Sequence, residues 1–197
     1  VVFDEITYLG FPFSISPTFQ KRNTNSTIEE SLVRVEEIQE ICLKNNKQLV
    51  LYLSMGFGNP YGDIYNQNIL LHWASEMAAR DITIISLADT VGLANPQQIT
   101  DALLALIPTY QNITFGVHLH STKTSFQPKL QAAIGAGCLR FDGALQGIGG
   151  CPMAQDDLVG NMPTELMIDY LEHQGIVTSL NKNALQESLL IATEIFI

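Results

Sequence analysis

The sequence predicts an α/β protein in which five strands alternate with helices around a parallel sheet. Short apolar runs begin near residues 5, 48, 83, 113 and 138, and each is followed by a segment whose apolar residues recur at helical spacing. One unit therefore takes about 25–45 residues, which is the length of a βαβ repeat. The second run, QLVLYLSM at 48–55, is apolar on both faces, as in a parallel sheet. An open doubly wound sheet and a (β/α)8 barrel both fit this pattern.

Local signals place the elements in chain order. Strands are predicted at 5–9, 48–55, 83–87, 113–118 and 138–142, and helices at 27–44, 66–80, 95–106, 127–136, 164–173 and 183–195. The first helix begins at overlapping capping boxes on Ser26 and Thr27. Pro96 lies in the first turn of the third helix, and Gly137 ends the fourth. A loop is expected after the first strand, and a long Gly-rich loop at 143–163.

Composition limits the classes of partner. Twenty acidic residues against ten basic ones give a net charge of −10, and no Lys/Arg-rich run is present. This balance argues against nucleic acid and an anionic membrane as partners, although local donors can still hold a small anion. No apolar stretch reaches the roughly 18–20 residues of a membrane helix. Cys42, Cys138 and Cys151 make an odd count without metal-type spacing, which favours reduced thiols in an intracellular protein.

The sharpest chemical signal is the pair His118 and His120 at the end of a predicted strand. Residues two apart on a strand point to the same side, roughly 6.5–7 Å apart at the backbone, so both imidazoles can converge on one metal ion. The structural alternative is a pair of hydrogen-bonded histidines. Asp89 ends the preceding strand, where it can bind metal, orient a ligating histidine, or only cap a turn.

Weaker candidates lie in the loops. Cys151 follows two glycines in the Gly-rich loop, where a thiol can donate or accept a proton near a metal, although a lone cysteine is more often structural. Asn161 can ligate through its amide oxygen or serve only as a turn residue. Tyr61 and Ser16, in the loops after the first two strands, are candidates for contact with substrate.

Taken together, these segments resemble the 3-hydroxy-3-methylglutaryl-CoA lyase family, which belongs to a superfamily of metal-dependent lyases and synthases built on a (β/α)8 barrel. The resemblance covers nearly the whole chain, and its most specific element is the Gly-Gly-Cys-Pro loop at 149–152 followed by Gly-Asn at 160–161. It implies cleavage of 3-hydroxy-3-methylglutaryl-CoA (HMG-CoA) to acetyl-CoA and acetoacetate. The roles it implies are a divalent metal, Mg²⁺ or Mn²⁺, on His118, His120 and Asn161, proton transfer by Cys151, an active-site role for Asp89, and substrate contacts from Tyr61, Ser16, Gly149 and Gly150.

The resemblance also implies an acyl-CoA substrate, a homodimer, and a part in leucine degradation and ketone-body formation. Where family members often have Asp after the second histidine, this chain has Ser121, and the acidic segment 155–159 replaces a small, Gly/Ala-rich one. A related aldolase, an acyl-CoA-condensing synthase and a non-catalytic homologue stay open as alternatives.

The family's Arg-Asp pair on the first barrel strand has no counterpart in this sequence. We therefore expect residues 1–197 to be one partial catalytic domain, about strands 4–8 of a (β/α)8 barrel with the first three units missing, and inactive alone. The start at Val1 and the helical pattern up to Ile197 suggest that residues are absent at the start, and the completeness of the end stays open. We expect a cytoplasmic protein, with a mitochondrial or peroxisomal location left open because a targeting signal would precede Val1.

Overall fold

The fold centres on a parallel sheet whose strands follow one another in chain order. The computed structural model describes residues 3–122, 124–150, 159–176 and 178–196. The sheet order is β1-β2-β3-β4-β6, so β1 and β6 are its edges. The strands are β1 (Tyr8–Ser14), β2 (Gln48–Ser54), β3 (Ile84–Ala88), β4 (Thr114–His118) and β6 (Arg140–Asp142). A second, two-residue antiparallel pair joins β5 (His120–Ser121) to β7 (Gly160–Asn161).

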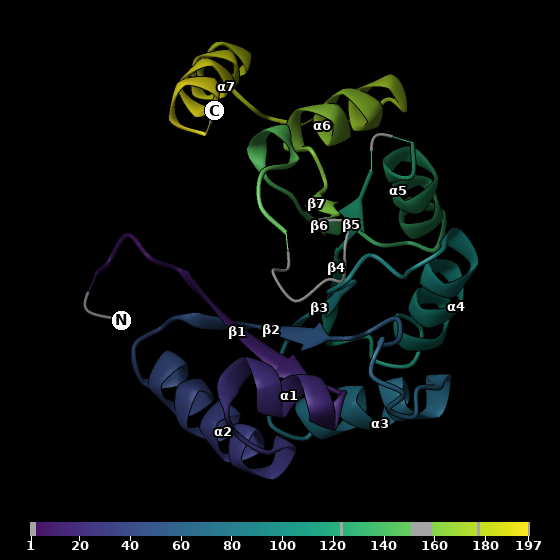
Figure 1. Ribbon diagram of the computed structural model, residues 1–197. Coiled ribbons are helices and arrows are strands. Elements are labelled where there is room, and N and C mark those ends of the chain that lie inside the picture. Colours follow the sequence, from purple (N-terminus) through teal and green to yellow (C-terminus); the bar gives the residue numbers. More distant parts are fainter. Residues whose placement is uncertain (1–2, 123, 151–158, 177, 197) are drawn as a thin grey trace.

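The helices show which of the two α/β architectures the sheet belongs to. They are α1 (Pro17–Thr24), α2 (Ile28–Lys44), α3 (Gln67–Ala78), α4 (Pro96–Leu106), α5 (Phe126–Gly135), α6 (Thr164–His173) and α7 (Lys182–Ile195), with a 3₁₀ turn η1 at Leu145–Gly147. Figure 1 shows α2 to α5 as an arc around the outside of the strands. A doubly wound sheet carries helices on both faces and reverses its strand order at a switch point. The uninterrupted order and one-sided arc are instead those of a length of barrel wall, which the described residues leave open between β1 and β6.

The core lies between the strands and this arc of helices. Leu51 and Leu53 of β2 are fully buried, in one apolar cluster with Val35 of α2 and Leu103 of α4. Because side chains alternate along a strand, Tyr52 points to the opposite, inner face of the sheet. The outer face therefore holds the fold together, and the inner face is left for a site. Within the described residues, no helix combines the length and apolar character needed to cross a membrane.

Most predicted elements are confirmed to within about two residues, the usual uncertainty of element ends. The first strand is a correction, since it runs over 8–14 and not 5–9. Pro12 breaks the apolar pattern in the sequence, but in the structure it lies within β1, opposite Tyr52 of β2. The loop expected next contains the short helix α1, which Ser16 caps and Pro17 begins.

We expect Thr27→Ala to lower the free energy of unfolding by about 1 kcal/mol. The Thr27 hydroxyl accepts from the Glu30 N–H at 3.2 Å, and the Glu30 carboxylate accepts from the Thr27 N–H at 2.8 Å, so the change breaks a complete capping box at the start of α2. Urea unfolding followed by circular dichroism measures the loss. Thr100→Ala is the control, since this hydroxyl donates to the Pro96 carbonyl inside α4 and caps no helix. Equal losses in the two variants would contradict the capping role.

Candidate metal and substrate site

The structure brings the two histidines together on the inner face of the sheet. His118 ends β4 and His120 begins β5, and their ring centroids lie 5.4 Å apart with the planes at 82°. Both line a pocket of about 360 Å³. The other residues that line it are Gly10, Pro12, Tyr52, Ser54, Ala88 and Thr90. Four neighbouring strands and the segments that follow them thus contribute to one pocket.

The ring of His120 is held in a single tautomer. Its Nδ1 lies 2.8 Å from the carbonyl oxygen of Asp89, and a carbonyl can only accept a hydrogen bond. Nδ1 therefore carries a proton, and in the neutral ring Nε2 is the nitrogen with the lone pair. A backbone carbonyl that fixes the tautomer in this way is the usual partner of a metal-binding histidine.

His118 is neutral and has an uncommitted nitrogen. Burial, and next the neighbouring His120, lower the pKa of His118 below its ordinary value. Its Nδ1 is buried and has no hydrogen-bond partner among the described residues; the nearest carboxylate, that of Asp142, is 3.9 Å away. A neutral imidazole is the form that binds a metal.

Asn161 reaches the histidines through the antiparallel pair of β5 and β7. It lies directly opposite His120 in the register, where Cβ atoms are typically about 4.5–5.5 Å apart. Its Nδ2 donates to the carbonyl of Ile148 at 2.8 Å, so the amide oxygen is the atom that can bind a cation. Asn161 also lines a second pocket, of about 580 Å³, beside the one that holds the histidines.

The two loop glycines lie tightly against β7. Gly149 has a φ of +89°, in the region that favours glycine, and a Cβ there would lie 3.1 Å from Nδ2 of Asn161. A Cβ on Gly150 would lie 2.7 Å from the carbonyl oxygen of Val159, closer than real contacts allow. These glycines therefore support Asn161. Cys151 and residues 155–158 lie outside the described residues.

The carboxylate of Asp89 is turned away from the pocket. Its side chain is 1% exposed, and Oδ2 accepts from the ammonium of Lys129 at 2.7 Å. Oδ1 accepts from the N–H of Ala94 at 2.9 Å. Both oxygens are thus committed, and the contact of Asp89 with the histidine pair runs through its backbone carbonyl.

Ser16 and Tyr61 lie away from the histidines. The Ser16 hydroxyl donates to Asp63 at 2.5 Å and accepts from the N–H of Phe19, as the cap of α1. The Tyr61 ring stacks on Phe19, with the Arg22 guanidinium 4.8 Å from its centroid. Neither residue lines the pocket of His118 and His120.

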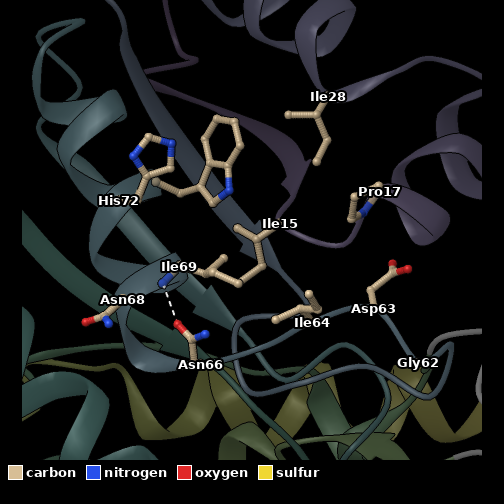
Figure 2. Close-up of a pocket in the computed structure, with 11 residues that line it drawn as sticks. Ile15, Pro17, Ile28, Gly62, Asp63, Ile64, Asn66, Asn68, Ile69 and His72 are labelled. Atoms are coloured by element: carbon tan, nitrogen blue, oxygen red, sulfur yellow. Dashed lines mark hydrogen bonds between the residues drawn. The ribbon is translucent and has the colours of Figure 1, made fainter.

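A larger pocket, of about 710 Å³, lies on the outer side of the fold (Figure 2). It is lined by Ile15, Pro17, Ile28, Gly62, Asp63, Ile64, Asn66, Asn68, Ile69, His72 and Trp73. Its wall is mainly apolar, and it shares no lining residue with the pocket of the histidine pair. We therefore place the candidate chemistry in the smaller pocket.

The residues present fit a divalent metal ion. His118 and His120 supply imidazole nitrogens, one of them without a protein partner, and Asn161 supplies an amide oxygen opposite. The described part of the chain contains no group of three His, Cys, Asp or Glu residues that could hold a metal. Imidazole nitrogens and an amide oxygen are donors that divalent metal ions accept in proteins.

Comparison with known proteins identifies the family. A family model described as HMGL-like matches residues 8–190. The chain belongs to the HMGL-like family. It is 31% identical over 167 residues to the hydroxymethylglutaryl-CoA lyase YngG of Bacillus subtilis, covering 85% of this chain and 56% of the relative.

Solved structures of HMG-CoA lyases also match the chain. The crystal structure of the Bacillus subtilis HMG-CoA lyase matches with a TM-score of 0.87 and 29% identity, over 96% of this chain and 63% of that one. An HMG-CoA lyase from Acinetobacter baumannii, solved with coenzyme A and 3-methylmalate, matches with a TM-score of 0.81 and 29% identity, over 91% of this chain and 58% of that one. The chain spans about half the length of the curated relatives it matches.

Three polar residues of this HMGL-like site escape the sequence reasoning. Asp142 accepts from the Ser86 hydroxyl at 2.8 Å and the Arg140 guanidinium at 3.1 Å, beside His118. It ends strand β6, which is the same signal that singled out Asp89. In the sequence, Tyr52 is only one aromatic residue within an apolar strand. In the sequence, Lys129 looks like an ordinary polar helix residue, and no local pattern predicts its burial.

Proposed function

We propose that the protein is an HMG-CoA lyase, which cleaves 3-hydroxy-3-methylglutaryl-CoA to acetyl-CoA and acetoacetate with the help of a divalent metal ion. The observation that carries the proposal is the pairing of His118 and His120 at one pocket, with Asn161 opposite His120 in the β5–β7 register, in a member of the HMGL-like family. The coenzyme A bound to the Acinetobacter relative supports an acyl-CoA substrate.

We further propose that residues 1–197 form part of a catalytic domain, strands 4–8 of a (β/α)8 barrel. Three observations support this division. Within the described residues, β1 and β6 each pair with a sheet neighbour on one side only. Tyr8 at the start of β1 is 57% exposed, and α7 leaves Leu190, Ile191 and Ile195 exposed. Three further βα units would pair with both edges, and the Arg-Asp pair that the resemblance implies would lie on the first of them.

In this proposal, His118, His120 and Asn161 hold Mg²⁺ or Mn²⁺. When bound, the metal supplies Lewis-acid polarisation of the substrate's hydroxyl and carboxylate oxygens. The Asp89 carbonyl holds the Nδ1–H of His120, so that Nε2 is the nitrogen left for the metal, and burial favours the neutral form of His118 by lowering its pKa. Cys151, next to Gly150, would give a proton to the acetyl-CoA carbanion formed when the carbon–carbon bond breaks. The choice of metal, the homodimer and the cytoplasmic location stay predictions.

The test is an assay of the complete gene product with HMG-CoA. We expect acetoacetate formation, its loss after dialysis against EDTA, and its recovery with Mg²⁺ or Mn²⁺, because the donor set binds through nitrogen and oxygen atoms alone. A 2-oxo-acid aldol is the comparison substrate. Cleavage of the aldol without any cleavage of the CoA thioester would reject the lyase and favour an aldolase of the same fold.

A further inference from the structure

Lys129 of α5 is a buried lysine whose ammonium group reaches three acceptors. Its side chain is 6% exposed. Nζ donates to Oδ2 of Asp89 at 2.7 Å, to the backbone carbonyl of His120 at 2.7 Å and to that of Gly92 at 3.3 Å. An ammonium has three protons, so every donor is used. One side chain thus joins α5, the segment after β3 and the start of β5.

These contacts form a closed ring around His120. The Nδ1 of His120 donates to the Asp89 carbonyl, the Asp89 carboxylate accepts from Lys129, and Lys129 donates to the His120 carbonyl. The backbone and the imidazole of His120 are therefore both held through the same pair of residues. None of these three hydrogen bonds involves Nε2 of the His120 imidazole.

We propose that Lys129 is a positioning residue, which sets the orientation of His120 for a divalent metal ion. The inference rests on the proposed function in one respect only, that His120 is a metal ligand. Partners that orient a ligand from outside typically change metal affinity by about 10–100-fold when they are removed. Loss of the Lys129 ammonium releases the His120 carbonyl and leaves the Asp89 carboxylate without its cation, so the strand end that carries the imidazole is no longer fixed.

A second buried lysine provides a matched control. Lys47, just before β2, is 9% exposed, and its ammonium donates to the backbone carbonyls of Phe3 at 2.9 Å and Asp4 at 3.5 Å. It lies at the amino end of the strands, the opposite end of the sheet from His120. Lys47→Met removes a buried ammonium of similar kind without touching the histidine pair.

The experiment measures Mn²⁺ binding by electron paramagnetic resonance in the complete gene product. We expect Lys129→Met to raise the Kd for Mn²⁺ by about 10–100-fold. Lys47→Met should leave that Kd unchanged, although both variants unfold at a lower temperature. Wild-type affinity in Lys129→Met, equal loss in both variants, or no Mn²⁺ binding by the wild type would each overturn the inference.

Two further measurements keep the inference testable if Lys129→Met does not fold. Lys129→Met combined with Asp89→Asn removes both charges, and we expect the same loss of Mn²⁺ affinity from it. In the wild type, long-range ¹H–¹⁵N spectra of histidine should show His120 protonated on Nδ1; protonation on Nε2 instead would overturn the inference. Cleavage of HMG-CoA enters neither readout, so a failure of the proposed function appears only in its own assay.

Discussion

His118→Ala and His120→Ala, each alone, should lower kcat/KM for HMG-CoA by about 1,000-fold. Lewis-acid polarisation of the substrate is worth several kcal/mol, and each ~1.4 kcal/mol corresponds to a factor of ten. The two rings share one pocket, and His118 has a nitrogen without a partner among the described residues, so each removal would take a donor from the proposed metal ion. Steady-state assays at saturating and limiting Mn²⁺ measure the effect.

His72→Ala is the matched control for these substitutions. His72 is exposed on α3 and lines the outer pocket, so we expect activity within about twofold of the wild type. Unchanged activity in His118→Ala, with Mn²⁺ affinity also unchanged, would make the pair structural and the metal-dependent mechanism wrong.

Asp89→Ala should lower the free energy of unfolding by about 3–5 kcal/mol, since it leaves the ammonium of Lys129 buried without a counter-charge. Asp89 is 1% exposed and Lys129 is 6% exposed, and their charged atoms are 2.7 Å apart. Denaturant unfolding measures the loss. Adding Lys129→Met to Asp89→Ala should restore most of the stability, because the unpaired charge is then gone.

An exposed ion pair provides the comparison. Lys44 and Glu40 lie 3.1 Å apart at 71% and 70% exposure, and Glu40→Ala should cost less than about 0.5 kcal/mol. A loss below 1 kcal/mol in Asp89→Ala would show that water reaches Lys129 in solution, and that the Asp89 carboxylate is free to act at the pocket.

The sequence predicted the elements that local signals define. The capping box at Thr27 and the proline at Pro96 locate helix ends through hydrogen bonds and dihedral limits within a few residues. The first strand was misplaced because Pro12 interrupts its apolar pattern, and only the tertiary pairing with β2 shows that the strand continues through it.

The candidate site shows the same division. The convergence of His118 and His120 follows from their spacing on a strand. The direction in which a carboxylate points does not follow from the sequence. The side chain of Asp89 faces Lys129 across 40 residues of sequence, and its backbone carbonyl contacts His120. The burial of Lys129 depends on where α5 packs, and no local pattern contains that information.

The short antiparallel pair of β5 and β7 has a consequence for the order of folding. Each strand of the parallel sheet pairs with the next strand along the chain, so the wall from β1 to β4 can grow during synthesis on the ribosome. Asn161 meets His120 only after α5, β6 and η1 have been made and packed. Since contacts between distant segments form late, we expect Asn161 to join the histidine pair last, on a wall that is already in place. A nascent chain that stops before β7 would then carry both histidines and yet lack the amide opposite them.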